Sequence, residues 1–110
     1  MTTARVEAEV RDDTVCIAVS GEIDLANANI VQDQINAAIA NDLTTVVLDL
    51  SGLEYLDSAG LRVLFTLADR LRVLQMGLEL LVAPQSAVRK AVELSGLEPV
   101  ARLGPGPGRD

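Results

Sequence analysis

The residues with the clearest chemical potential are an aspartate and a serine, Asp57 and Ser58, which stand between two apolar runs. Asp57 precedes a segment with helical periodicity, in the place of an N-cap, so Ser58 would begin the helix. Four backbone N–H groups are unsatisfied at such an end, and the helix dipole favours negative charge there. A phosphoryl group on the Ser58 hydroxyl would bring about −1.5 to −2 charges to this end. The pattern therefore allows a modification site that the fold could accept.

Gly60 stands in the same predicted first turn, where glycine costs up to about 1 kcal/mol of helix propensity. With Ala59 beside it, the backbone around the hydroxyl would be nearly bare and open to close approach by another protein. The residue types alone also allow a simpler interpretation. In that interpretation Asp57 or Ser58 is only a cap, Gly60 is a packing residue, and nothing is modified.

The composition excludes several other kinds of chemistry. The 110 residues contain no histidine, which removes catalytic triads with an imidazole base and imidazole metal ligands. No P-loop motif occurs. The one cysteine, Cys16, stands in an alternating apolar run, where a small buried side chain is its expected role. We therefore expect a binding module rather than an enzyme, with no cofactor and no metal.

The charge of the chain narrows the choice of partners. Nine basic and sixteen acidic residues give a formal net charge of −7. A surface with this excess of carboxylates repels nucleic-acid phosphates and anionic lipid headgroups. The sequence has no apolar leader at its start and no run of about 18 uncharged apolar residues. We expect a cytoplasmic protein that contacts neither nucleic acid nor the membrane directly.

The elements that would position Ser58 alternate strands with helices. Apolar and polar residues alternate at 6–10 and again at 15–19, which predicts a β-hairpin with one solvated face. Gly21 would close the second strand. The further predicted elements are a loop at 22–24, a helix at 26–41, a central strand at 45–50, a connection at 51–57, a helix from 58 to near 77, a strand at 78–83, and a helix after the N-cap Ser86 that ends at Gly96 with Leu97 as its apolar partner.

This order of elements predicts an α/β fold in one domain. Right-handed crossovers would place the helices on one face of a small mixed sheet of four to five strands that begins with the hairpin. We expect the domain to span residues 1–103. Residues 104–110, rich in glycine and proline, are expected to be disordered.

Within residues 46–61 a predicted strand runs into the motif Asp-Leu-Ser, and the motif Asp-Ser-x-Gly-Leu follows it. This segment resembles the signature of the STAS domain of bacterial anti-sigma factor antagonists. Residues 21–25, Gly-Glu-Ile-Asp-Leu, and residues 88–97 stand where that family has its other marks. The resemblance covers residues 6–103 and implies the STAS fold.

The resemblance also implies partner switching in transcription regulation. In that family the antagonist binds an ATP-bound anti-sigma factor, a serine kinase, and so frees a sigma factor. The kinase then phosphorylates the antagonist, and a metal-dependent serine phosphatase reverses the modification. Carried over, the phosphoacceptor is Ser58. The expected partner-binding residues are Asp24, Leu53, Glu54, Tyr55, Leu56 and Asp57, together with Ala59, Gly60 and Arg62 of the predicted helix. Arg62, at i+4 from Ser58, either pairs with a phosphate or is a solvated helix residue.

Two other functions fit parts of the pattern. A phospho-aspartate receiver would use Asp49, but its magnesium site needs an acidic pair after the first strand and a lysine after a later one. Here Glu7 and Glu9 lie inside a predicted strand and Lys90 inside a predicted helix. A STAS accessory subunit of a transporter, including lipid transporters, would keep the fold without the switch. The exposed hydroxyl expected at Ser58 favours the kinase substrate.

Overall fold

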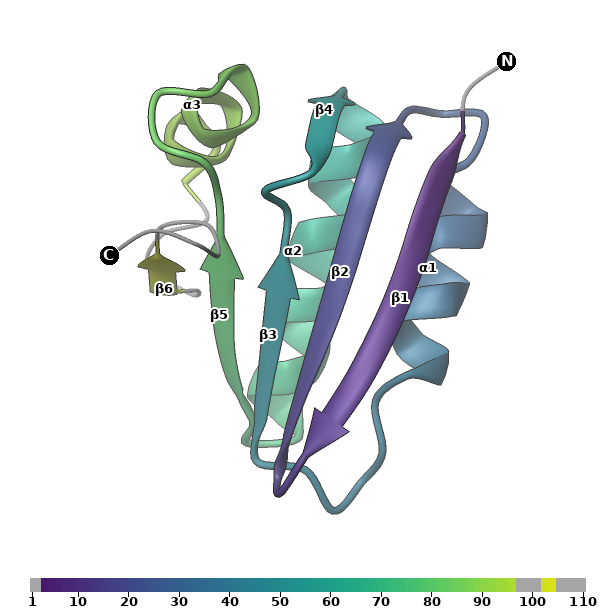
Figure 1. The fold of residues 1–110 in the computed structure, drawn as a ribbon, viewed down its shortest axis with the longest axis vertical. Coiled ribbons are helices and arrows are strands. Elements are labelled where there is room, and N and C mark those ends of the chain that lie inside the picture. The colour runs from purple at the N-terminus through teal and green to yellow at the C-terminus, as the bar shows by residue number, and fades with distance from the viewer. Residues whose placement is uncertain (1–2, 97–101, 105–110) are drawn as a thin grey trace.

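A mixed β-sheet forms the centre of the computed structural model, which describes residues 3–96 and 102–104 (Figure 1). The predicted α/β fold class is confirmed, with the hairpin at its N-terminal end. The elements are β1 (Ala4–Arg11), β2 (Thr14–Ile23), α1 (Ala28–Ala37), β3 (Thr45–Asp49), β4 (Leu53–Leu56), α2 (Ser58–Val73), β5 (Gly77–Leu81), α3 (Ala87–Leu94) and β6 (Arg102–Gly104).

The strands lie in the order β1-β2-β3-β5-β6, with β4 paired to β2 beside this path. β1 and β2 are antiparallel, and all the other described pairs are parallel. β3 is central, as its apolar and β-branched sequence predicts. β2 has ten residues, so its first half pairs with β3 and its last three residues pair with β4. With the short strands β4 and β6 the sheet has six strands, more than the four to five predicted.

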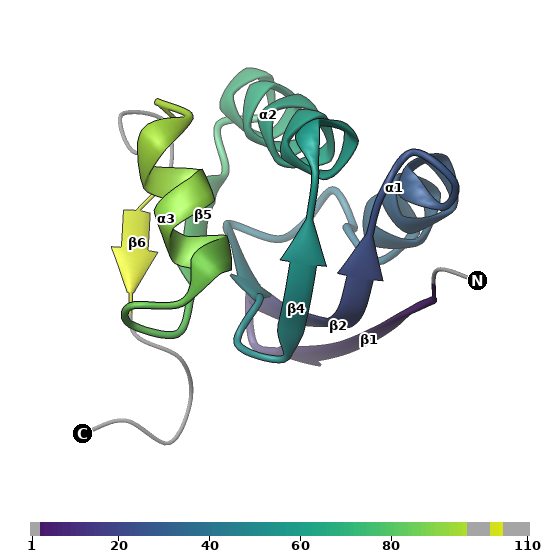
Figure 2. The ribbon, with the colours of Figure 1, turned by 90° about the horizontal axis from the view of Figure 1, so that it is seen from above.

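Helices α1 and α2 cover one face of this sheet (Figure 2). Their apolar stripes pack against the inward residues of β2, β3 and β5, which accounts for most of the core. The fully buried large side chains include Ile17, Val19, Ile35, Leu48, Leu64, Leu71 and Leu80. α3 lies apart from these two helices, at the carboxyl end of the strands and in contact with β4 (Figures 1 and 2). Neither α1 nor α2 covers the opposite face of the sheet, and within residues 3–96 that face carries no helix packed flat against it (Figure 2).

Gly21 does not close β2, which corrects the prediction made from its residue type. It has a φ of +95°, and the strand continues past it to Ile23 with a register shift at this point. A Cβ at position 21 would lie 2.5 Å from the Thr3 carbonyl oxygen. Glycine therefore permits an irregularity within the strand where any side chain would clash. As a result, residues 22 and 23 belong to β2 rather than to a loop.

The ends of the helices follow the capping signals better than the apolar spacing. α1 is shorter than the predicted 26–41, whereas the N-cap of α3 is confirmed, since the Ser86 hydroxyl accepts the Arg89 N–H at 3.0 Å. Gly96 has a φ of +86°, as a C′ glycine requires. Its expected partner Leu97 and residues 105–110 of the expected tail lie outside the described residues. Gly104, which we assigned to that tail, is the last residue of β6.

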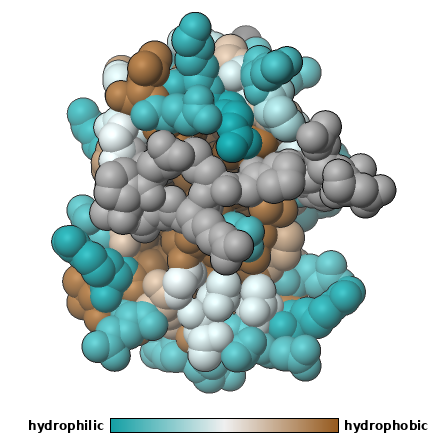
Figure 3. All heavy atoms as spheres, turned by 90° about the vertical axis from the view of Figure 1, so that its left-hand side faces the viewer, coloured by the Kyte–Doolittle hydropathy of each residue, from teal (hydrophilic) through white to brown (hydrophobic). Residues whose placement is uncertain are grey.

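The helices of the described ranges have one apolar side each. α2, with 16 residues, buries Val63, Leu64, Leu67 and Leu71 and exposes polar residues between them. None of these helices combines the length and the apolar character needed to traverse a bilayer. Seen from the β5–β6 side, hydrophobic residues show in separate places at the upper left, at the lower left and near the middle, with hydrophilic residues between them and along the edges (Figure 3).

Candidate functional site

Ser58 is the first residue of α2, and it is exposed. β4 ends at Leu56, so one residue, Asp57, separates the strand from the helix. The backbone of Asp57 is extended, with φ −103° and ψ −164°. This turn lies at the carboxyl end of the sheet, at the top of Figure 1. The predicted position of Ser58 at the start of the helix and its exposure are therefore confirmed.

Asp57 fixes the start of α2 through both its side chain and its backbone. Its Oδ1 accepts the N–H of Ala59 at 2.8 Å and that of Gly60 at 3.2 Å, which confirms the predicted N-cap. Its own N–H donates to the Ile23 carbonyl at 3.2 Å. An N-cap of this kind is typically worth about 1 kcal/mol. The residue before Ser58 thus ties the helix to the end of β2.

Asp24, which follows β2, lies beside the turn between β4 and α2, and these two connections form the corner that carries Ser58. Ile23 pairs with Leu56 in the β2–β4 ladder, so the residues that follow them, Asp24 and Asp57, leave the sheet side by side. Asp24 is half-buried, and its Oδ1 accepts the Ala26 N–H at 2.8 Å. The structure brings together two aspartates that the sequence analysis expects among the partner-binding residues.

The other expected partner-binding residues divide by exposure. Glu54, Tyr55 and Arg62 are exposed, with Tyr55 at 51%, and Ala59 is half-buried. Leu53, Leu56 and Gly60 are buried. The surface that a partner can reach is therefore narrower than the sequence indicates, and it consists of the exposed side chains around Ser58.

Gly60 is buried, whereas the bare backbone expected beside Ser58 would be exposed. Its Cα faces the interior, where a Cβ would lie 2.8 Å from the Cβ of Leu56 and 3.4 Å from that of Ile23. A real Cβ does not approach other atoms at the first of these distances without a shift of the structure. Gly60 thus allows α2 to pack closely on β4 and β2, and it does not leave a bare surface beside Ser58.

The sequence analysis missed two residues of this corner. Asn27 is 8% exposed, and its side chain makes two hydrogen bonds to the backbone, one to Glu22 in β2 and one to Asp24 in the β2–α1 connection. Leu25, in the same connection, is 81% exposed. Asn27 is the second residue of the helix predicted at 26–41, and an asparagine in that place is an N-cap signal that could have drawn attention to it. Nothing in the sequence predicts that Leu25 is exposed, because apolar residues are common in the connection between a strand and a helix.

The model of the STAS domain family matches residues 5–106 of the chain. The chain belongs to the STAS domain family. It is 33% identical over 88 residues to the anti-sigma-F factor antagonist RsfB of Mycobacterium tuberculosis, an alignment that covers 79% of this chain and 70% of that protein. This finding confirms the family resemblance that residues 46–61 indicate.

Solved structures agree with this STAS assignment. A crystal structure of an anti-sigma factor antagonist from Mycobacterium paratuberculosis has a TM-score of 0.84 at 28% identity, covering 96% of this chain and 88% of that chain. The anti-sigma factor antagonist SpoIIAA in its unphosphorylated form has a TM-score of 0.73 at 26% identity, covering 91% and 88%. The STAS fold is therefore confirmed over nearly the whole chain.

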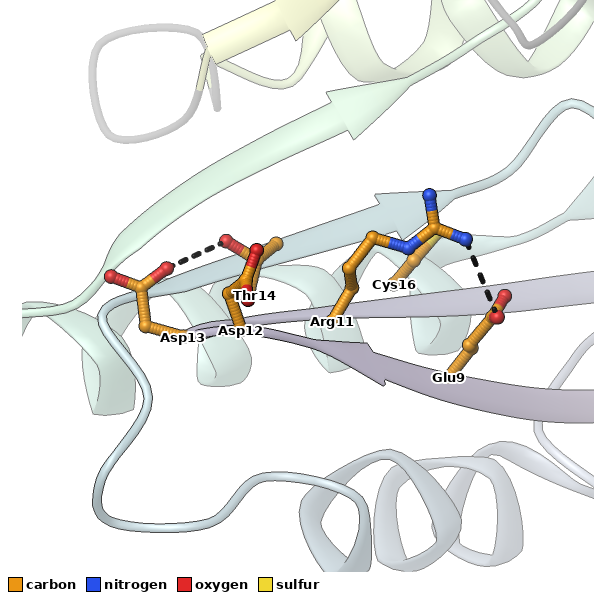
Figure 4. A pocket seen from close by; sticks show the side chains of 6 residues that line it. All are labelled: Glu9, Arg11, Asp12, Asp13, Thr14 and Cys16. Atoms are coloured by element: carbon orange, nitrogen blue, oxygen red, sulfur yellow. Dashed lines mark hydrogen bonds and ion pairs between the residues drawn. The ribbon is translucent and has the colours of Figure 1, made fainter.

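A pocket lies at the opposite end of this STAS domain, beside the β1–β2 turn (Figure 4). It is lined by Glu9, Arg11, Asp12, Asp13, Thr14 and Cys16. Arg11 and Glu9 form an exposed ion pair at 3.7 Å, and the Thr14 hydroxyl donates to Asp13 Oδ1 at 3.3 Å. Its polar groups contact one another and do not surround a nucleophile with a base, so Ser58 remains the better candidate site.

Cys16, which lines this pocket, is exposed rather than buried as expected. It alternates in β2 with Val15 and Ile17, which face the helices, so its side chain points to the opposite face of the sheet. Partial burial raises the pKa of the Cys16 thiol, and the carboxylates of Asp49 and Glu9 raise it further. The thiol is therefore a weak nucleophile at neutral pH in spite of its exposure.

We expect iodoacetamide to alkylate Cys16 more slowly in the native STAS domain than in the chain unfolded in urea, near neutral pH. The raised pKa leaves less thiolate in the native state, and the difference should shrink as the pH rises above the thiol pKa. Mass spectrometry of timed samples measures both rates. Glu9→Gln removes one of the two carboxylates and should accelerate the native reaction. Equal rates for the native and unfolded chains would contradict this account.

Proposed function

We propose that this STAS domain is an anti-sigma factor antagonist that binds an ATP-bound anti-sigma serine kinase and is inactivated by phosphorylation of Ser58. The observation that carries the proposal is the exposed Ser58 hydroxyl on a turn held by Asp57. The names of the relatives support the antagonist role, and one solved relative is described in its unphosphorylated form. A hydroxyl in this position can enter the active site of another protein without unfolding α2.

In the phosphorylation reaction this chain contributes only the acceptor hydroxyl. Ser58 Oγ attacks the γ-phosphorus of ATP, the hydroxyl proton passes to a base of the kinase, and ADP leaves. The kinase supplies the nucleotide, the base and the metal ion. A metal-dependent serine phosphatase would restore the hydroxyl by hydrolysis. This division of roles agrees with a chain that contains no histidine.

The exposed residues around Ser58 form the surface on which we place the kinase. Tyr55 offers an amphipathic ring of the kind enriched in protein interfaces. Glu54 and Asp24 make the surface acidic, so basic groups of the partner would complement it. Arg62 lies one turn further along α2, at the spacing from which a guanidinium can pair with a phosphate at position 58.

The test uses the wild-type chain, labelled ATP and the anti-sigma kinases encoded in the same genome. We expect one kinase to bind the unmodified chain and to label Ser58, as located by mass spectrometry. Ser58→Ala should bind with similar affinity and stay unlabelled, because it lacks only the hydroxyl. Ser86→Ala, which removes the N-cap serine of α3, should be labelled like wild type.

Several outcomes would count against this proposal. Label on another residue of the folded wild-type chain would overturn the site. An acyl phosphate that is lost in mild base would indicate a phospho-aspartate receiver. Co-purification with the ATPase subunit of a transporter, together with no labelling by any of the kinases, would indicate an accessory subunit.

A further inference from the structure

The corner that carries Ser58 contains one buried polar side chain, that of Asn27. Asn27 immediately precedes α1, yet its side chain makes no capping hydrogen bond to that helix. Its Oδ1 instead accepts the Asp24 N–H at 3.0 Å, and its Nδ2 donates to the Glu22 carbonyl at 2.9 Å. The side-chain amide therefore bridges the two residues on either side of Ile23.

A continuous series of hydrogen bonds leads from this bridge to Ser58. The carbonyl of Ile23, between the two bridged residues, accepts the Asp57 N–H at 3.2 Å. The Asp57 carboxylate then caps the first turn of α2, which begins at Ser58. Asn27 thus fixes the strand end against which the turn carrying Ser58 is set.

The same bridge orders the connection between β2 and α1. The Asp24 carbonyl accepts the N–H groups of Asn27 at 3.2 Å and Ala28 at 2.9 Å, and its carboxylate accepts that of Ala26. The connection held in this way presents Leu25 to solvent. A large apolar side chain on an ordered, exposed segment is suited to contact with a partner.

We propose that Asn27 is a positioning residue, which holds Asp24 and Leu25 in the arrangement that the kinase recognises together with Ser58. This inference rests on the proposed function. An ordered segment binds without first having to reach its bound conformation. If removal of the bridge lowers the population of that conformation about tenfold, the apparent dissociation constant rises about tenfold. The chemical step, which takes place at Ser58 inside the kinase, is then little affected.

Asn36, in the helix that follows Asn27, provides a matched control. It is half-buried, and its Oδ1 accepts a hydrogen bond from Arg70 Nη1 at 2.7 Å, which joins α1 to α2 away from the corner. Asn36→Ala removes the same type of side chain and one of its hydrogen bonds. It therefore reports the effect of a general loss of stability.

The experiment measures KM and kcat for phosphorylation of the full chain, with urea unfolding to confirm that each variant is folded. Asn27→Ala should raise KM about tenfold and leave kcat within about twofold. Asn36→Ala should leave both close to wild type. If Asn27→Ala does not fold, Asn27→Ser retains one donor and one acceptor on a shorter side chain and should raise KM to a smaller extent.

Amide hydrogen exchange of the free chain gives a second readout without a kinase. The Asp24 and Asp57 amides should exchange about tenfold faster in Asn27→Ala and at the wild-type rate in Asn36→Ala. If wild-type Ser58 is phosphorylated but Asn27→Ala keeps the wild-type KM and exchange rates, the positioning role is wrong and the proposed function stands. If no kinase labels wild-type Ser58, the proposed function fails, and the recognition role fails with it. Equal losses in Asn27→Ala and Asn36→Ala would also overturn the inference.

Discussion

A chain phosphorylated at Ser58 should bind its anti-sigma kinase roughly 100- to 3000-fold more weakly than the unmodified chain. The phosphoryl group places about two negative charges beside Asp57 and Asp24, on a surface that the complex would exclude from water. Leaving a buried charge without a partner typically costs about 3–5 kcal/mol, which is two to three and a half decades in a dissociation constant, and pairing of the phosphate with Arg62 would bring the loss towards the lower end of this range. Calorimetric titration of the kinase with the two forms measures the difference.

The hydrogen bonds of Asp57 strengthen this expectation. The amino end of a helix usually stabilises an added anion through its unsatisfied N–H groups. In α2 the Asp57 carboxylate already accepts two of these, from Ala59 and Gly60. A phosphoryl group on Ser58 would therefore lie beside the Asp57 carboxylate, at a helix end where the sequence alone indicates unsatisfied N–H groups. The modification adds charge that the helix end does not fully neutralise.

Two substitutions separate the charge of the phosphoryl group from its size. Ser58→Asp adds one negative charge and should weaken binding by less than phosphorylation does. Ser58→Asn has nearly the same shape without the charge and should bind more tightly than Ser58→Asp. Added salt should reduce the difference between these variants where the contact stays partly hydrated. Equal affinity of the phosphorylated and unmodified chains would rule out switching by charge.

The local features of the site could be predicted because each depends on residues within one turn of chain. An aspartate ahead of an apolar-periodic segment is enough to indicate the N-cap of α2, and Ser58 follows from it directly. The same holds for Ser86 and Gly96 at the two ends of α3. The alternation in β2 likewise predicted its two faces.

The features that were missed depend on contacts between distant segments. β4 has only four residues, with a buried residue at each end and two exposed between them, so it shows no alternation that could identify it. Asn27 and Gly60 acquire their roles only once β4 lies beside the end of β2. Cys16 was predicted wrongly because its residue type was given more weight than the alternation of β2, which places it on the face opposite Val15 and Ile17.

Gly60→Val should lower the free energy of unfolding by about 3 kcal/mol, because position 60 has no room for a side chain. A Cβ there would lie 2.8 Å from the Leu56 Cβ and 3.4 Å from the Cβ and Cγ2 of Ile23, and valine adds two further methyl groups. The better helix propensity of valine recovers less than about 1 kcal/mol. Urea unfolding measures the change, and the melting temperature should fall by roughly 12–24 °C.

Gly77→Ala is the control for the general effect of adding a Cβ. At that position the nearest atoms would lie 3.8–3.9 Å away, an ordinary contact distance, so the free energy of unfolding should change by less than about 1 kcal/mol. The comparison of Gly60→Val with Gly77→Ala decides between two roles for Gly60, namely close packing of α2 and a bare surface for the partner. If Gly60 is needed for packing, Gly60→Val loses stability before any partner is added, and α2 can relieve the clash only by moving away from Leu56 and Ile23, which carries Ser58 with it. If Gly60→Val kept wild-type stability and only kinase binding fell, the bare surface that the sequence indicates would be the correct role.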